Sequence, residues 1–348
     1  MSTPKFRLAL DPNSRVPPLR NLSHHAPSTL PPPKSLQSAT PSSHNTATLT
    51  FIGTATTILE WSGLRVLTDP NFLHAGDHVH LGPGVTATRV TDPAVPLDKL
   101  PPVDVILLSH YHEDHFDRKV EEELHRDIPI VTTPHAHAHL AHKPDAESFT
   151  AVYPLDPFEC GVIPILGGAG SNKPAIRVTA MPGKHVPPGP AHILDKVNDL
   201  LGAVPPTNGW MLELGHEYDA AWSCDYRIYI SGDTLLVDEL REIPERYKDQ
   251  RIDLMLVHLG GTTIPGPNLP LLMVTMDAAQ GIELMRLIHP EITIPIHYDD
   301  YDVFLSPLSD FKAAVTAAGL DEKVVYLDRG DAFGFEVKVG DALPGKRK

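Results

Sequence analysis

Cysteine is nearly absent from this chain of 348 residues. The two cysteines, Cys160 and Cys224, cannot build a framework of disulfide bonds, and neither stands in a spacing typical of a cysteine metal site. We therefore expect both side chains to be reduced thiols.

Long apolar runs and an excess of basic charge are also absent. No stretch approaches the roughly 18 consecutive apolar residues of a membrane span, and the first residues contain no apolar signal-peptide core. The 29 lysines and arginines are outnumbered by 44 acidic residues, which gives a net charge of −15. This balance disfavours a nucleic-acid partner. We expect a cytoplasmic enzyme with a small-molecule substrate and no integral membrane association, and the sequence leaves homo-oligomer formation open.

The chain divides by composition. Residues 1–46 are rich in Pro, Ser and Asn, which predicts a flexible or surface-wrapping arm that we expect to be dispensable for stability. Residues 47–340 form the predicted catalytic body, and 341–348 form a tail. Two loop-rich stretches, 71–102 and 186–208, are predicted insertions near the site, the second as a lid with a short apolar helix.

Periodicity predicts many short strands and a few helices in the body. Strands are predicted at 48–52, 56–60, 64–68, 103–108, 128–132, 150–153, 175–180, 209–214, 226–230, 254–258, 292–296, 324–327 and 333–337. Helices are predicted at 117–126, 277–288 and 307–318. This order predicts an α/β fold in which two mixed sheets pack together with helices outside, an αββα sandwich.

One histidine-rich loop follows directly on the apolar run at 103–108. It contains His110, His112, Asp114 and His115, so that three imidazoles and a carboxylate fall within six residues. These are ligand types that suit zinc and similar divalent ions. The complete pattern stands at the end of a predicted buried strand. This context favours a metal site over a polar surface loop that is merely rich in histidine.

Further polar residues stand directly after other predicted strands. The full set of candidate ligands is His110, His112, Asp114, His115, His185, Asp233 and His297. Seven ligands are enough for two metal ions, and a carboxylate such as that of Asp233 can bridge them through its two oxygens. Zinc lowers the pKa of bound water to about 7, so the site predicts hydrolysis by a metal-bound hydroxide.

These motifs resemble the metallo-β-lactamase superfamily, in particular the branch that contains L-ascorbate-6-phosphate lactonase and N-acyl-phosphatidylethanolamine phospholipase D. The resemblance covers about residues 48–338. It is carried by the segments at 53–56, 67–70, 108–115, 231–234 and 295–298, together with His185.

The resemblance implies a role for each ligand. His110, His112 and His185 would hold one metal ion. The second ion would be held by Asp114, His115 and His297, with Asp233 bridging. Asp114 would also orient or deprotonate the attacking water, and Asp69 would contact the outer nitrogen of a ligand imidazole. Asp69 is also compatible with a simple turn before Pro70.

The remaining candidates are weaker. His258 follows a strand and either faces the substrate or packs in the interior. Tyr111, Tyr298 and Asp299 flank ligands and are candidates for the substrate pocket. A run with His135, His137, His139 and His142 would place His135, His139 and His142 on one helix face, which permits a metal site but favours a solvated face.

We therefore expect a dinuclear hydrolase that cleaves a small-molecule lactone, ester or phosphodiester. The alternatives are an N-acyl phospholipid phosphodiesterase, a nuclease of the same fold, an iron-dependent oxygenase, and a binding module stabilised by metal. Histidine-rich ligation favours two Zn²⁺ ions, while the carboxylates also suit Mn²⁺ or iron. A purely structural zinc needs only four ligands, so the larger set disfavours the binding module.

Overall fold

The computed structural model describes residues 3–21, 26–38, 46–81, 85–167, 173–186, 204–218, 221–266 and 269–338. The predicted tail at 341–348, the apolar helix of the predicted lid and most of the stretch 186–208 lie outside the described residues.

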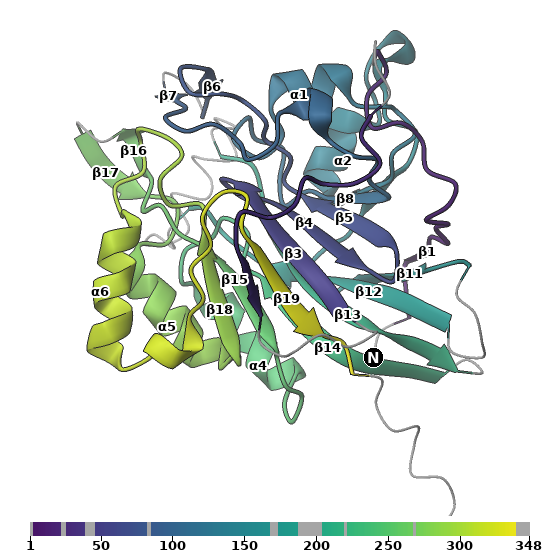
Figure 1. The fold of residues 1–348 in the computed structure, drawn as a ribbon. Coiled ribbons are helices and arrows are strands. Elements are labelled where there is room, and N and C mark those ends of the chain that lie inside the picture. The colour runs from purple at the N-terminus through teal and green to yellow at the C-terminus, as the bar shows by residue number, and fades with distance from the viewer. Residues whose placement is uncertain are drawn as a thin grey trace, which may run out of the picture.

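Two large mixed sheets form the centre of the described structure (Figure 1). One has the strand order β1 (Phe6–Arg7), β11 (Cys160–Pro164), β12 (Lys173–Pro182), β13 (Asn208–Tyr218), β14 (Ala221–Ile230), β15 (Leu254–His258) and β18 (Ile292–Ile296). The other has the order β10 (Val152–Pro154), β9 (Ile130–Thr132), β8 (Val105–Leu107), β5 (Leu64–Thr68), β4 (Thr56–Trp61), β3 (Thr46–Gly53), β19 (Ala332–Glu336) and β2 (Leu36–Ser38). Two small hairpins stand apart, β6 (His78–His80) with β7 (Thr86–Thr88), and β16 (Thr263–Gly266) with β17 (Leu269–Met273).

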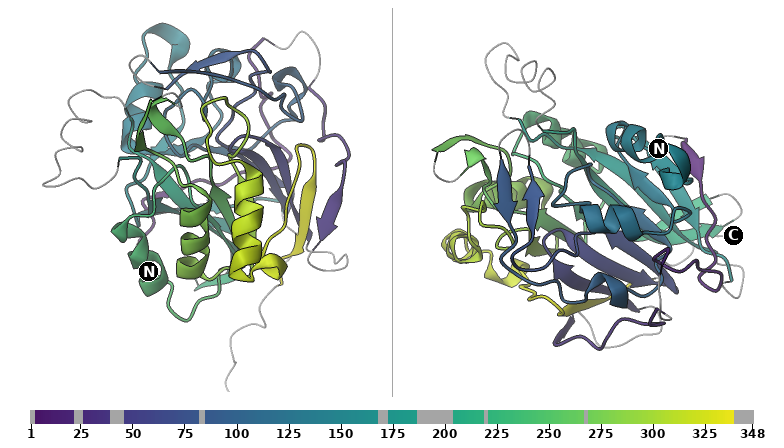
Figure 2. Two further views of the ribbon diagram at one scale, coloured as in Figure 1. Left: turned by 90° about the vertical axis from the view of Figure 1, so that its left-hand side faces the viewer. Right: turned by 90° about the horizontal axis from the view of Figure 1, so that it is seen from above.

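Helices cover the outer faces of both sheets. The α-helices are α1 (Arg118–Glu123), α2 (Pro134–Leu140), α4 (Glu242–Arg246), α5 (Ala278–Ile288) and α6 (Leu308–Ala318). Single 3₁₀ turns lie at η1 (Leu97–Lys99), η2 (Asp145–Glu147), η4 (Asp238–Arg241) and η5 (Asp321–Lys323). Helices α5 and α6 lie side by side on one flank (Figure 2).

Alternation along the strands places apolar side chains on both faces of each sheet. In β8, Val105 and Leu107 point into the core between the sheets, whereas Ile106 packs with α1 and α2 outside. In β15, Leu256 joins the central core and Met255 packs with α5 and α6. Each sheet is thus buried on both faces, which explains the near-continuous apolar runs. The predicted αββα sandwich is confirmed.

Local sequence signals set several helix ends. Asp117 caps α1, because its side chain accepts a hydrogen bond from the Val120 backbone N–H at 2.8 Å. Asp277 caps α5 in the same way through Gln280. The Gln280 side chain does not complete a capping box with Asp277, since it accepts a hydrogen bond from the Leu236 backbone N–H instead. Helix α6 ends at Gly319, which has a positive φ of 68°.

One predicted strand is absent, and several strands, of which β11 lies next to the central strands of its sheet, were not predicted. Residues 324–327 form no strand, and only an isolated bridge joins Val324 to Thr293. Strand β11 was not predicted, since its sequence contains Gly161 and Pro164 and lacks a clear apolar alternation. It lies beside β12 in the seven-stranded sheet.

The described parts of the N-terminal arm wrap around the surface of the body. Strand β1 pairs with β11, β2 pairs with β19, and the side chain of Leu19 is buried against the outer face of the eight-stranded sheet. Arg15 forms an ion pair with Asp104 at 2.9 Å. These contacts favour the surface-wrapping alternative and argue against a dispensable arm. The division of the chain into arm, body and tail stays a prediction.

Replacing Leu19 by alanine tests whether the arm stabilises the body. Leu19 is 5% exposed, so Leu19→Ala should lower the free energy of unfolding by about 2 to 3 kcal/mol. Leu36→Ala is the matched control, because Leu36 is 61% exposed on the same arm and should cost less than about 0.5 kcal/mol. Denaturant unfolding of both variants measures the difference. Equally small losses of unfolding free energy in both variants would show that the arm does not stabilise the body.

Candidate metal centre

The ends of parallel strands bring distant residues to one edge of the sandwich. Strands β5 and β8 are parallel neighbours, as are β14, β15 and β18. The segments that leave these strands therefore emerge at the same edge, where the carboxyl ends of parallel strands commonly form sites. Asp69 and His110 follow the first pair, and Asp233 and His297 follow the second group. The site therefore lies where the two sheets meet.

All seven predicted ligands lie in this one cluster, in three overlapping groups that could hold a metal. The groups are Asp114 with His115, Asp233 and His297; His110 with His185 and Asp233; and His110 with His112 and Asp114. Asp233 and Asp114 each belong to two groups. This overlap is the arrangement expected when carboxylates lie between two neighbouring ions.

The distances within the cluster are short. The Nε2 atoms of His115 and His297 lie 3.1 Å and 3.5 Å from Asp233 Oδ2. His297 Nε2 also lies 3.5 Å from Asp114 Oδ2, and the Nε2 atoms of His110 and His185 are 3.3 Å apart. The side chains thus point inward at a common centre.

Several of these inward-pointing atoms are suited to bind a metal ion, because they have no hydrogen-bond partner. The Nε2 atoms of His115 and His297 and Oδ1 of Asp233 are buried and form no hydrogen bond with acceptable geometry. Buried polar atoms in folded proteins nearly always have a partner. Imidazole nitrogens and carboxylate oxygens that converge without one match the donor set of zinc or a similar divalent ion.

Backbone carbonyls fix the orientation of two of the imidazoles. His185 Nδ1 lies 2.9 Å from the Val274 carbonyl oxygen, and His297 Nδ1 lies 2.9 Å from that of Leu259. A carbonyl oxygen only accepts, so Nδ1 carries the proton and donates it. The lone pair is then left on Nε2, the inward atom, as metal binding requires.

Asp69 supports the cluster from behind. Its Oδ1 accepts a hydrogen bond from the Ser109 backbone N–H at 2.7 Å, and its Oδ2 lies 3.4 Å from His115 Nδ1. Asp69 has a positive φ of 34°, a conformation that costs energy for a residue with a side chain. This is the contact that the resemblance implied for Asp69.

Burial and mutual charge set the protonation of the cluster. Burial lowers the pKa of His110 well below its usual range and that of His185 to about 4, so both are neutral. Burial opposes ionisation of Asp114, but the imidazoles of His115 and His112 outweigh it and hold the pKa of this carboxyl well below its usual range. These are the forms that bind a metal ion.

The pKa values of His115 and His297 shift in the opposite direction from those of His110 and His185. Burial lowers the pKa of His115, but the carboxylates of Asp233, Asp114 and Asp69 together outweigh burial and raise that pKa well above its usual range. The pKa of His297 is also raised, since Asp233 and Asp114 outweigh its burial. The raised pKa values favour the protonated form of both imidazoles beside these carboxylates. A metal ion bound there would displace such a proton.

His258 lies behind the ligands and is fully enclosed. It is 1% exposed, its Nδ1 lies 3.3 Å from Ser231 Oγ, and its Nε2 lies 3.9 Å from Asp69 Oδ2. Its ring stacks on that of His115 at 6.1 Å between centroids. Of the two alternatives for His258, these contacts favour the packed histidine over the substrate-facing one.

Three candidates for the substrate pocket point elsewhere. The Tyr111 hydroxyl donates to Glu121 at 2.8 Å, and the Tyr298 hydroxyl donates to the Leu327 carbonyl oxygen at 3.3 Å. Asp299 forms an ion pair with Arg329. The expectation that sequence neighbours of ligands line the pocket is not met for these groups, because neighbouring side chains on a loop point in different directions.

A buried polar network beside the centre was missed from the sequence. Asp300 Oδ2 accepts from the Thr54 backbone N–H at 2.7 Å, and the Thr54 carbonyl oxygen accepts from the His297 backbone N–H at 2.9 Å. Arg89 pairs with Asp300 at 3.1 Å, and both side chains are fully buried. The network thus supports the backbone of a ligand. Its only sequence signal is that Asp300 follows His297 by three residues.

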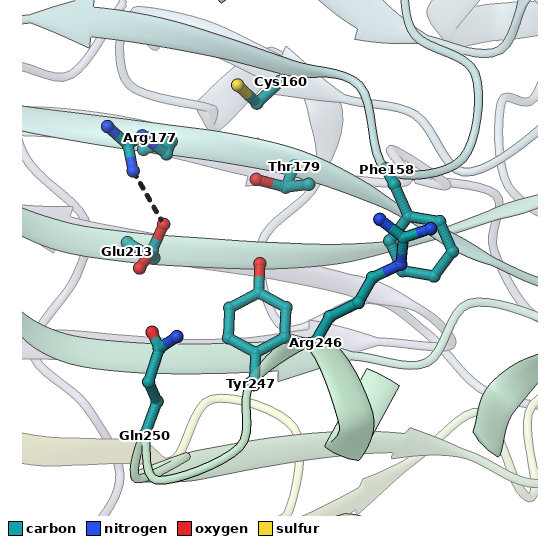
Figure 3. A pocket seen from close by; sticks show the side chains of 8 residues that line it. All are labelled: Phe158, Cys160, Arg177, Thr179, Glu213, Arg246, Tyr247 and Gln250. Atoms are coloured by element: carbon teal, nitrogen blue, oxygen red, sulfur yellow. Dashed lines mark ion pairs between the residues drawn. The ribbon is translucent and has the colours of Figure 1, made fainter. Parts of the chain in front are cut away.

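A separate hollow of about 360 Å³ lies away from this centre (Figure 3). It is lined by side chains from β11, β12 and β13 and by residues at the end of α4 and beyond it. Within this hollow, Glu213 Oε2 lies 3.7 Å from Arg177 Nη1. Glu213 also forms an ion pair with Arg227, with 3.1 Å between Oε1 and Nε. No candidate ligand lines this hollow, and the charge of its buried carboxylate is paired.

Comparisons with known proteins agree with the fold and the cluster. A family model described as "Beta-lactamase superfamily domain" matches residues 65–298, more than half of the chain. A metal-dependent hydrolase of Archaeoglobus fulgidus is 25% identical over 82% of this chain and 98% of its own length.

Two solved structures have the same fold. An isothiocyanate hydrolase from Delia radicum gut bacteria has a TM-score of 0.61 at 20% identity, covering 83% of this chain and 99% of its own. A possible metal-dependent hydrolase from Veillonella parvula has a TM-score of 0.62 at 17% identity, covering 82% and 98%. Together with the histidine motif, the match of the family model shows that this chain belongs to the metallo-β-lactamase superfamily.

Proposed function

We propose that this protein is a dinuclear metal-dependent hydrolase of a small-molecule lactone, ester or phosphodiester. The observation that carries the proposal is the buried cluster in which five imidazoles and two carboxylates face a common centre. A structural metal would need only four closed ligands. The larger, overlapping set supports two adjacent ions.

The chain's residues divide between the two ions as follows. His110, His112 and His185 would hold the first, Asp114, His115 and His297 would hold the second, and Asp233 would contribute to both. Two divalent ions bound there, most simply Zn²⁺, would supply a nucleophilic water at neutral pH and polarise the oxygen of the substrate. The overlap of the groups at Asp233 supports this division.

Asp114 is the residue that we assign to the proton of the attacking water. Its Oδ2 lies among the ligands of the second ion, 3.5 Å from His297 Nε2 and 3.8 Å from His115 Nε2. Its Oδ1 is turned toward His112 Nδ1 at 3.0 Å, on the side of the first ion. A carboxylate that reaches both sides and is ionised could orient the attacking water and accept its proton.

The charge of the chain and its neighbours in fold bear on the substrate class. The net charge of −15 disfavours long polyanions such as nucleic acids as substrates. Of the described helices, none is long and apolar enough to cross a membrane. A neighbour in fold hydrolyses isothiocyanates, by its description, so that an isothiocyanate belongs beside the lactones, esters, phosphodiesters and N-acyl phospholipids in a substrate panel.

Replacing Asp114 by asparagine tests the assignment of the proton acceptor. Asp114→Asn keeps the shape of the side chain but removes its charge, so turnover of whichever substrate the panel identifies should fall by about 10² to 10⁴-fold. Asp238→Asn is the control, because the Asp238 side chain is 94% exposed and belongs to no part of the site. Near-native turnover in Asp114→Asn would overturn the assignment.

Replacing Asp69 by asparagine tests the support behind His115. The amide of Asp69→Asn offers an uncharged group to His115 Nδ1, and asparagine tolerates the positive φ at this position. Metal affinity, measured by competition with a chromogenic chelator, should fall by about 10 to 100-fold. Asp98→Asn, at an exposed position, should leave the affinity unchanged. Unchanged affinity in Asp69→Asn would remove Asp69 from the metal centre.

Removal of the metal ions tests their link to stability. A ligand at 1,000 times its dissociation constant stabilises the folded state by about 4 kcal/mol, so dialysis against a chelator should lower the melting temperature by several degrees and abolish hydrolysis. Adding back Zn²⁺ should restore both. Activity that survives removal of all bound metal, checked by mass spectrometry, would contradict the proposal.

A further inference from the structure

Helix α2 carries a second pair of facing imidazoles outside the metal centre. His135 and His139 stand one turn apart on this helix, and their Nε2 atoms lie 3.3 Å from each other. Residues four apart share a helix face, so the pair follows directly from the helical geometry. In Figure 1, α2 lies on the outer side of the eight-stranded sheet, above β8.

The separation of the two nitrogens matches that of ligands on one tetrahedral ion. Two imidazole nitrogens that each lie about 2.0 to 2.1 Å from a tetrahedral zinc are about 3.3 to 3.4 Å apart. The Nε2 atoms of His110 and His185 in the metal centre show the same 3.3 Å. A direct hydrogen bond between the nitrogens of His135 and His139 would be at the long end of the usual range.

One of the two rings is held in place by its surroundings. The His139 ring stacks on the Tyr111 ring, with centroids 4.9 Å apart and planes within 8° of parallel. Tyr111 is in turn held by the hydrogen bond from its hydroxyl to Glu121. This contact orients His139 before any ligand binds, which lowers the entropy that binding must overcome.

The protonation of His135 suits a ligand as well. Partial burial, and then the neighbouring His139, lower the pKa of His135 below its usual value. The imidazole is therefore neutral at physiological pH, and only the neutral form has a lone pair to offer a metal.

We propose that His135 and His139 form an accessory binding site for a single transition-metal ion, Zn²⁺ or Cu²⁺. Two histidines at positions i and i+4 of a helix provide half of a tetrahedral site, the same spacing as in helical zinc motifs. The nearby Glu121 carboxylate already accepts from Tyr111 and pairs with Lys143, so water completes the coordination. The site is therefore more open and binds more weakly than the enclosed centre.

The other histidines of this segment provide a natural control. His137 and His142 make an edge-to-face ring contact with each other, with centroids 5.4 Å apart, and His142 Nδ1 lies 3.4 Å from the Ala138 carbonyl oxygen. Their rings do not pair nitrogen to nitrogen in the described contacts. His137→Ala therefore removes one histidine from the same helix and leaves the proposed pair intact.

Calorimetric titration of the full chain with Zn²⁺ tests the proposal. The protein is first loaded with Zn²⁺ and desalted, and the tightly held metal is counted by mass spectrometry. Wild-type protein should then bind one further equivalent of Zn²⁺. The affinity for this ion should fall at least tenfold in His135→Ala and in His139→Ala, and should be unchanged in His137→Ala.

The count of tightly held metal and the circular dichroism melt separate this site from the central one. Both should be the same in all three variants, because His139 is exposed, His135 and His137 are partly exposed, and none belongs to the central cluster. If wild-type protein binds no further equivalent of Zn²⁺, or if His139→Ala binds it as tightly as wild type does, the two nitrogens only share a hydrogen bond. An equal loss in His137→Ala would show non-specific binding to the histidine-rich face.

Discussion

The structure depends most on two buried carboxylates, whose negative charges must be balanced by positive charge. Asp114 and Asp233 are 4% and 2% exposed, and each lies against imidazoles that turn their unpartnered nitrogens inward. Burying an uncompensated charge costs several kcal/mol per ion. The raised pKa values of His115 and His297 favour protonated rings that offset part of this cost, and divalent ions bound there would also offset it.

The fold meets this requirement by joining both sheets at the site. The His297 backbone N–H donates to the Thr54 carbonyl oxygen, and the Asn208 backbone N–H donates to that of Ser109. The first bond connects the residue after β18 to the turn between β3 and β4, and the second connects the first residue of β13 to the loop after β8. Thr54, Asp69 and His297 all have positive φ angles, and such strain persists only where the surrounding structure over-determines it. The sandwich therefore acts as a rigid frame for the ligands.

The surroundings of the centre extend the same network outward. The backbone of His297 contacts Thr54, which is bonded to the buried ion pair of Asp300 and Arg89. Next to His110 in the chain, Tyr111 packs against the face of α2. The described parts of the N-terminal arm lie along the edges of both sheets, where β1 and β2 are the outermost strands and pair with β11 and β19. Pairing covers strand edges that would otherwise be exposed to other chains.

The sequence by itself determined the fold class, the set of candidate ligands, the starts of α1 and α5 and the end of α6. These follow from local patterns: apolar runs bounded by turn residues, polar residues at strand ends, and caps such as Asp117, Asp277 and Gly319. Only the tertiary structure decided where Tyr111, His258 and Tyr298 point and that Asp300 supports a ligand. It also decided that the arm pairs with the sheets and that residues 324–327 form no strand. Those features depend on contacts between residues far apart in the chain, and no local pattern of residue types encodes such contacts.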